Sequence, residues 1–173
     1  MNELPVRKHP RMKAYDYSEI GCYYVTICTQ DKLPILSRVA VGRGLAPADI
    51  PVAKIELTAI GKIVESQLLD LPSRFHCVGI GKYVIMPTHI HVIIIISDDA
   101  AGASPRPTLM DIIRVFKSIS TRGCNQQDNV MGRKIWQTSF YDRVIRSEDA
   151  YQRIWQYIDE NPARWHQDEY YVI

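Results

Sequence analysis

Two histidines stand one residue apart at the start of an apolar run. Residues 83–96 read Y-V-I-M-P-T-H-I-H-V-I-I-I-I, which places His89 and His91 at the entrance of a predicted buried strand. Side chains two residues apart in a strand point to the same face, so the two imidazoles project side by side while Ile90 points away. Two neutral imidazoles that converge on one point can chelate a divalent cation. The alternative is that one or both are core histidines satisfied by backbone hydrogen bonds.

Two nitrogens do not complete a coordination shell, and the last predicted helix offers a third ligand. In I-W-Q-Y-I-D-E-N-P, Tyr157 and Asn161 lie four residues apart and therefore share one face of a helix. The amide oxygen of Asn161 is a hard ligand suited to Mg²⁺ or Mn²⁺, which would leave Tyr157 one turn from the metal. Taken alone, the pair equally fits a core aromatic and an asparagine that ends a helix before Pro162.

These side chains must be positioned by a fold that mixes strands and helices. Strands are predicted from aromatic and β-branched runs, and helices from apolar residues at helical spacing. The predicted strands are 22–29, 75–86, 89–96 and 139–146, and the predicted helices are 58–71, 109–120 and 147–161. Residues 38–53 carry Gly and Pro with weak periodicity and are predicted to be a surface excursion, and 98–108 and 123–134 to be loops. The order β-α-β-β-α-β-α indicates one α+β domain over residues 1–173, with a largely antiparallel sheet.

The composition is that of an ordinary globular protein. Of the 173 residues, 46% are hydrophobic and 23% charged, which suits one domain with a proper core. The longest wholly apolar stretch is Val92–Ile96, far short of the ~20 residues that a membrane span needs. The N-terminal residues lack an apolar signal segment, and the four cysteines form no C-x-x-C pair. We therefore expect a cytoplasmic protein without a membrane partner, a disulfide framework or a zinc knuckle.

Basic residues gather in two segments although the formal net charge is only +2. Local basic patches on a near-neutral body can contact phosphates, although any single one also fits an ordinary solvated face. The candidates for DNA contacts are Arg7, Lys8, Arg11 and Lys13 near the N-terminus, and Arg114, Lys117, Arg122, Arg133 and Lys134 in the later segment. Binding through such residues would depend strongly on salt.

The motifs in combination resemble a known family. P-x-H-I-H at 87–91, W-Q-x-S-F-Y-D-R-V-I-R at 136–146 and Y-I-x-x-N-P at 157–162 resemble the single-tyrosine HUH transposases, in particular the REP-associated tyrosine transposases. The stretch D-Y-S-x-x-G-x-Y-Y-V-T-I-C-T at 16–29 is also similar to that family, and the resemblance runs from about Arg11 to Trp165. It implies an HUH-endonuclease-like fold with a ferredoxin- or RRM-like core. Family members often carry Asn where this chain has Thr88, a difference that affects fine positioning rather than the chemistry.

The resemblance also implies an activity and the residues that perform it. In that family a histidine pair holds a divalent metal on the scissile phosphate of single-stranded DNA, a tyrosine attacks, and a polar residue four positions later completes the metal site. Position by position, His89, His91 and Asn161 become metal ligands for Mg²⁺ or Mn²⁺, and Tyr157 becomes the nucleophile. The implied enzyme is an endonuclease and strand transferase that forms a 5′-phosphotyrosine intermediate beside a DNA hairpin, as a monomer or a homodimer.

Alternatives remain for the nucleophile and for the function. Tyr141 and Tyr151 are the competing tyrosines, but the positions four residues after them hold Ile145 and Trp155, which cannot bind a metal. Trp136 could stack on a base, although a core position is favoured. A non-catalytic nucleic-acid-binding module and a metal hydrolase without a covalent step are the competing functions.

Overall fold

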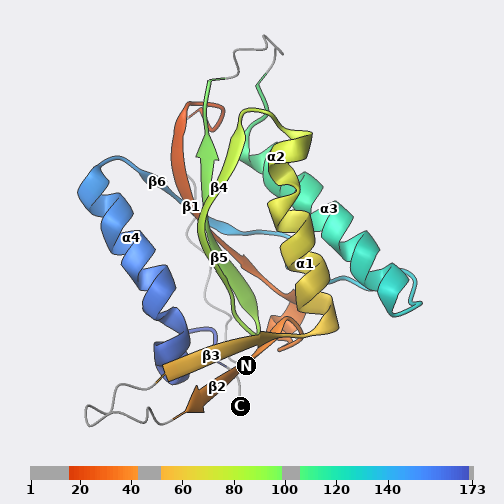
Figure 1. The fold of residues 1–173 in the computed structure, drawn as a ribbon. Helices are drawn as coiled ribbons and strands as arrows, with labels where there is room; N and C mark the ends of the chain where they lie inside the picture. Colours follow the sequence, from red (N-terminus) through yellow and green to blue (C-terminus); the bar gives the residue numbers. More distant parts are fainter. Residues whose placement is uncertain (1–15, 43–51, 99–105, 172–173) are drawn as a thin grey trace, which may run out of the picture.

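The computed structural model describes residues 16–42, 52–98 and 106–171 of the chain. Its main sheet holds four strands in the order β4-β5-β1-β6, and each neighbouring pair is antiparallel. The strands are β1 (Gly21–Cys28), β4 (Val78–Ile85), β5 (His89–Ile96) and β6 (Tyr141–Ile145). Helices pack on both faces, so the prediction of an α+β fold with a largely antiparallel sheet is confirmed (Figure 1).

The two faces of the sheet are covered by different helices. On one side lie α1 (Ala59–Leu69) and α3 (Leu109–Gln127), and the short α2 (Leu71–Arg74) follows α1 in the chain. On the other side lies α4 (Glu148–Glu160) (Figure 1). The alternation of β5 explains this division. Ile90, Val92 and Ile94 pack in the core with α1 and α3, whereas Ile93 packs with Ile158 of α4. His89 and His91 share the face of Ile93, which directs both imidazoles toward the α4 side.

Polar side chains cap the starts of the three longer helices. Thr108 forms a capping box with Asp111 at the start of α3, and the Ser147 hydroxyl accepts a hydrogen bond from the Ala150 amide at the start of α4. Thr58 caps α1 in the same way. The start of α4 matters most for the site, because it sets the register that carries Tyr157 toward the sheet.

The structure corrects the predictions for two segments that were expected to be irregular. The predicted surface excursion over 38–53 contains β2 (Ser37–Gly42), which pairs with β3 (Val52–Leu57) in an antiparallel ribbon; residues 43–51 lie outside the described part of the chain. The predicted loop over 123–134 begins five residues later, because α3 continues to Gln127. A Cβ at Gly123 would lie 2.9 Å from Ile63 Cγ2, so this glycine serves the close approach of α1 and α3 rather than a helix end.

Two short 3₁₀ segments complete the described elements, η1 (Gln30–Lys32) and η2 (Asn161–Gln167). Trp136 is buried, packs on Phe116 and donates from Nε1 to the Ser120 hydroxyl at 2.9 Å, so the core position favoured by the sequence is confirmed. Among the described helices, none combines the length and the apolar character that crossing a bilayer requires.

Candidate metal and nucleophile site

The two histidines of β5 meet through their outer ring nitrogens. His89 Nε2 and His91 Nε2 lie 2.9 Å apart, and both side chains are fully buried. The strand supplies this geometry, because the side chains are two residues apart on one face. The alternative of two unrelated core histidines, each bonded to the backbone, does not describe this arrangement.

Hydroxyl groups hold the inner nitrogens of both rings. The Thr88 hydroxyl donates to the Tyr170 carbonyl at 3.1 Å, so it accepts from His89 Nδ1–H at 3.2 Å. Two hydroxyl groups lie within hydrogen-bond distance of His91 Nδ1, Tyr24 Oη at 2.7 Å and Thr26 Oγ1 at 2.9 Å, and the Thr26 hydroxyl donates to Tyr24 Oη at 3.3 Å. With the proton of each ring on Nδ1, both Nε2 atoms present lone pairs to each other, an arrangement that a bound cation relieves.

Burial keeps both imidazoles neutral. It lowers the pKa of His89 to about 3, and the charge of Lys32 acts in the same direction. Burial, followed by the neighbouring His89, also lowers the pKa of His91 well below its usual value, while Asp168 acts against this shift. Neutral rings are the form that binds a metal, so no proton competes for the ligand nitrogens near neutral pH.

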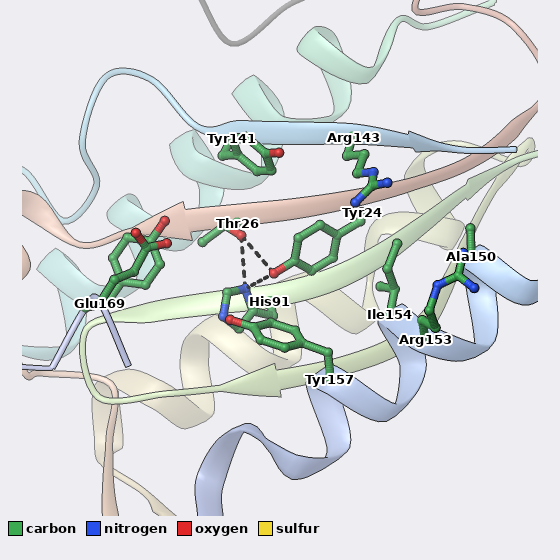
Figure 2. A pocket seen from close by; sticks show the side chains of 11 residues that line it. Tyr24, Thr26, His91, Tyr141, Arg143, Ala150, Arg153, Ile154, Tyr157 and Glu169 are labelled. Atoms are coloured by element: carbon green, nitrogen blue, oxygen red, sulfur yellow. Dashed lines mark hydrogen bonds between the residues drawn. The ribbon is translucent and has the colours of Figure 1, made fainter. Parts of the chain in front are cut away.

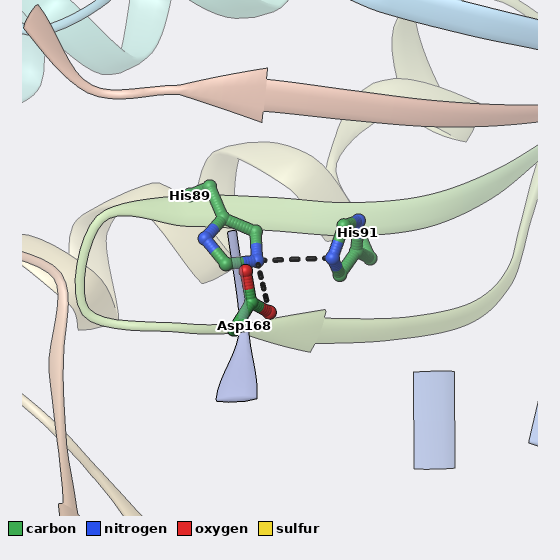
Figure 3. Close-up of side chains that lie close together, drawn as sticks. All are labelled: His89, His91 and Asp168. Carbon is green, nitrogen blue, oxygen red and sulfur yellow. Dashed lines mark hydrogen bonds and ion pairs between the residues drawn. The ribbon is translucent and has the colours of Figure 1, made fainter. Parts of the chain in front are cut away.

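The C-terminal segment brings a carboxylate to the pair. The Asp168 side chain is only 3% exposed, and its Oδ2 lies 3.8 Å from His89 Nε2, too far for a hydrogen bond (Figure 3). Its Oδ1 accepts from the Tyr170 amide at 2.7 Å, and Oδ2 accepts from Asn161 Nδ2 at 3.1 Å. One ligand atom from each of His89, His91 and Asp168 lies within 4.8 Å of the others.

Asn161 lies next to this group, but its side chain does more than the metal ligation that the sequence predicts. Its amide nitrogen holds the Asp168 carboxylate, while its Oδ1 is buried and has no hydrogen-bond partner among the described residues. A buried amide oxygen without a partner is uncommon and marks a place where a missing group could bind. Ligation by Asn161 therefore stays a prediction, and Asp168 is a further candidate ligand.

The donor set fits a hard divalent cation. Bonds of about 2.1 Å at a right angle would separate two ligand atoms by about 3.0 Å, close to the observed spacing of the histidine nitrogens. Carboxylate and amide oxygens beside the two nitrogens suit Mg²⁺ or Mn²⁺. The residues present therefore fit a divalent cation, and its identity as Mg²⁺ or Mn²⁺ stays a prediction.

Tyr157 projects from α4 toward the histidines. Its ring centroid lies 5.3 Å from that of His91 and 6.3 Å from that of Tyr24 (Figure 2). The side chain is 45% exposed, so its phenol can be reached from solvent. Burial, then the charges of Asp168 and Glu169, raise the pKa of Tyr157, while hydrogen bonds with Tyr24 and Asn161 lower it. The phenol is therefore protonated at neutral pH in the metal-free chain.

The predicted DNA-contacting residues lie away from this site or outside the described residues. Arg7, Lys8, Arg11 and Lys13 fall in the part of the chain that the structure does not describe. Arg114, Lys117 and Arg122 lie on α3, across the sheet from α4, and Arg133 and Lys134 follow that helix. Three of them have internal partners: Arg114 pairs with Asp111, Arg133 pairs with Asp128, and Lys117 donates to backbone carbonyls including that of Gln137. Their DNA contacts stay predictions.

Sequence reasoning missed Asp168 and the hydroxyl groups behind the rings. Asp168 follows η2, seven residues after Asn161, and no periodicity links it to the histidines. The only signal was an acidic residue in the stretch H-Q-D-E-Y-Y after the last predicted helix. Tyr24 and Thr26 could have been found more readily, since they alternate on a strand whose pairing with β5 sets Thr26 opposite His91.

Comparisons with known proteins agree with this architecture. No family model matches the chain. A Haemophilus influenzae protein described as uncharacterized is 29% identical over 181 residues, covering 96% of this chain and 93% of that protein. The solved structure of a REP-associated tyrosine transposase bound to a REP hairpin superposes with a TM-score of 0.53 at 16% identity, covering 95% of this chain and 74% of that one.

The chain has the fold of a REP-associated tyrosine transposase. The likeness spans nearly the whole chain, as the sequence motifs implied. A crystal structure from Deinococcus radiodurans described as a putative transposase also matches, with a TM-score of 0.48 at 17% identity, covering 87% of this chain and 95% of that one. Within the REP-associated tyrosine transposase fold, the histidine pair and Tyr157 occupy the α4 side of the sheet.

Proposed function

We propose that the protein is a metal-dependent, single-tyrosine DNA endonuclease and strand transferase. The observation that carries the proposal is the convergence of two neutral histidine nitrogens and a buried carboxylate beside a solvent-accessible phenol. The similarity in fold to a transposase solved with a REP hairpin supports the same class of substrate, single-stranded DNA that flanks a hairpin.

The proposed reaction assigns one role to each side chain. His89, His91 and Asp168 hold the cation, and Asn161 holds Asp168 and offers its own unpaired oxygen. When bound there, Mg²⁺ or Mn²⁺ supplies electrostatic stabilisation for the charge that develops on the phosphoryl oxygens.

Tyr157 forms the covalent intermediate. Its phenol oxygen bonds to phosphorus, the bond from phosphorus to the 3′ oxygen breaks, and the phenolic proton is lost while the 3′ oxygen gains one. The products are a 5′-phosphotyrosine and a free 3′-hydroxyl. Because the ester keeps the energy of the original phosphodiester, the 3′-hydroxyl of another strand can reverse the step without an external energy source.

Covalent adduct formation tests the proposal. Labelled single-stranded hairpin DNA is incubated with the protein in Mg²⁺, in Mn²⁺ and in EDTA, and the products are separated on a denaturing gel. We expect a metal-dependent adduct that survives SDS. Tyr157→Phe should reduce cleavage by about a thousandfold or more while leaving DNA binding nearly intact. Tyr151→Phe, on the same helix, is the matched control and should cleave normally.

The same gel separates the competing functions. Cleavage without any adduct would indicate a metal hydrolase that lacks a covalent step. DNA binding without cleavage in either metal would indicate a non-catalytic nucleic-acid-binding module. Each of these two results would contradict the proposal.

A further inference from the structure

A cavity of about 430 Å³ opens beside Tyr157, between β6 and α4. Tyr24, Thr26 and His91 line it toward the metal site, and Tyr141, Arg143 and Arg153 line it farther away (Figure 2). The cavity therefore extends the candidate site, and the roles proposed for the histidines and Tyr157 do not account for what it binds.

The two arginines enter the cavity from different elements. Arg143 lies two residues after Tyr141 on β6, so both side chains point to the same face. Arg153 lies four residues before Tyr157 on α4, which places it about one helical turn, or about 6 Å along the axis, from the proposed nucleophile. A group bound by both guanidinium groups would therefore lie next to the phosphate that Tyr157 attacks.

Neither arginine has a partner within the described part of the chain. Both are exposed, and no hydrogen bond or ion pair joins either of them to another described residue. The contrast with other arginines is clear. Those that pair with a carboxylate are Arg74, Arg106, Arg114, Arg133 and Arg164. Two unpaired guanidinium groups that face one cavity favour an anion there, and phosphate suits their planar donors.

An aromatic ring lies on the same wall. Tyr141 is 47% exposed, whereas its neighbour Phe140 is buried in the core. An exposed ring beside cationic groups is the combination that single-stranded nucleic acid uses, with bases stacked on aromatics and phosphates on arginines. Glu169, which also lines the cavity, lies at the opposite end from the two arginines in Figure 2, so it does not neutralise them.

We infer that this cavity binds the nucleotide next to the scissile phosphate. Arg143 and Arg153 hold its backbone phosphate, and Tyr141 stacks on its base. The inference rests on the proposed function, because it takes the DNA strand to run past Tyr157. It adds a site for single-stranded DNA on the α4 side, separate from the basic residues on and after α3.

The test measures DNA binding without catalysis. Tyr157→Phe protein in EDTA is titrated into a fluorescently labelled DNA hairpin with oligothymidine flanks, and into the same hairpin without flanks, and anisotropy is recorded at several salt concentrations. Arg143→Gln/Arg153→Gln should weaken binding to the flanked hairpin on the order of tenfold at low salt. The slope of log affinity against log salt should become less steep by about 0.7, since the two arginines hold one phosphate and each phosphate contact on a single strand contributes about 0.7.

A matched variant controls for the loss of charge. Arg74→Gln/Arg164→Gln removes the same two charges from ion-paired residues outside the cavity and should leave both affinity and slope unchanged. The hairpin without flanks should bind equally to all three proteins. The inference is overturned if the two double variants behave alike, if the loss is as large without flanks, or if the protein binds neither DNA.

Replacement of the ring tests the base contact separately. Tyr141→Ala should weaken binding to the flanked hairpin by about fivefold or more, and Tyr141→Phe should restore it. With abasic flanks, the loss of affinity caused by Tyr141→Ala should vanish, while the loss caused by the arginine double variant should persist. If Tyr141→Ala still weakens binding to abasic flanks, the stacking role is overturned. Because no step needs cleavage, a protein that binds as described but never cuts DNA would refute the proposed function and leave this inference standing.

Discussion

The two faces of the four-stranded sheet use the same strands in opposite ways. On the α1–α3 face, β5 contributes Ile90, Val92 and Ile94 to a core of buried apolar side chains. On the α4 face, the first half of the same strand contributes His89 and His91, whose ring nitrogens are held by hydroxyl groups. One face therefore supplies most of the buried apolar packing, and the other supports polar groups that apolar packing alone would not retain.

The comparison shows that alternate residues of β5 have different roles, with some packing in the core and others forming the candidate site. The core residue Ile90 is the direct sequence neighbour of both candidate ligands, His89 and His91, and the pleat of the strand decides which face each side chain joins. If this division is correct, substitutions on the α4 face should impair the reaction, and substitutions on the α1–α3 face should impair folding. The following predictions test that division, from the largest expected effect to the smallest.

Loss of one histidine should have the largest effect on the reaction. We expect His91→Gln to lower cleavage by about a thousandfold or more and to abolish specific Mn²⁺ binding, because one ligand nitrogen is gone. Free Mn²⁺ measured by electron paramagnetic resonance reports the binding. The exposed His76 provides the matched control, and His76→Gln should bind metal normally. Mn²⁺ binding by His91→Gln that equals that of the unsubstituted chain would contradict the assignment.

Truncation on the opposite face should affect stability instead. Ile94 is fully buried between the sheet and its helices, so Ile94→Ala should lower the free energy of unfolding by about 2–5 kcal/mol. Urea unfolding measures this change. Cleavage per folded molecule should stay near its normal value. A loss of cleavage as large as that of His91→Gln would show that the two faces are not separable in this way.

Replacement of the carboxylate should reveal which oxygen binds the metal. Asp168→Asn keeps the shape of the side chain and should weaken Mn²⁺ binding by about 10- to 100-fold, because it removes the anionic donor. Asn161→Ala removes the unpaired oxygen and the hydrogen bond to Asp168 together. If Asp168→Asn binds Mn²⁺ normally while Asn161→Ala does not, Asn161 is the ligand and Asp168 is not.

Acid should destabilise the metal-free chain through the same two histidines. Burial lowers both pKa values, so the folded state stays unprotonated while the unfolded state takes up protons below its ordinary pKa of about 6.5. The stabilisation is present above that pH and is lost as the pH falls toward the folded-state pKa of about 3 for His89. The slope should approach about 2.7 kcal/mol per pH unit for two groups.

Urea unfolding in EDTA between pH 7 and pH 5 measures this slope. His89→Gln/His91→Gln, which lacks both titrating rings, should give a flatter dependence. Equal slopes for the two proteins would mean that the histidines are not held neutral by burial.

Much of the fold could be predicted from the sequence because local patterns agree with the tertiary structure. The predicted strand 89–96 coincides with β5, since an uninterrupted apolar run bounded by Pro87 and Asp98 leaves little freedom. The end of α3 could not be predicted, because Gly123 ordinarily interrupts a helix and is required here only by the approach of Ile63. The ribbon of β2 and β3 was missed because its pairing is not visible in a weakly periodic segment.

The site was predictable only where neighbours in sequence are neighbours in space. The histidine spacing and the helical spacing of Tyr157 and Asn161 are local patterns, and the structure brings these side chains together. Asp168 reaches His89 through the turn after η2, and Arg143 and Arg153 line one cavity from two different elements. Such contacts depend on the packing of α4 and the C-terminal segment, which no periodicity encodes.

Identification of the residue that becomes attached to DNA tests the central claim most directly. The adduct formed with Mn²⁺ and single-stranded hairpin DNA is digested with trypsin and nuclease, and the modified peptide is sequenced by mass spectrometry. We predict a phosphonucleotide on Tyr157. Attachment to Tyr24, Tyr141 or Tyr170, which line the same cavity, would contradict the account of α4 as the helix that carries the nucleophile.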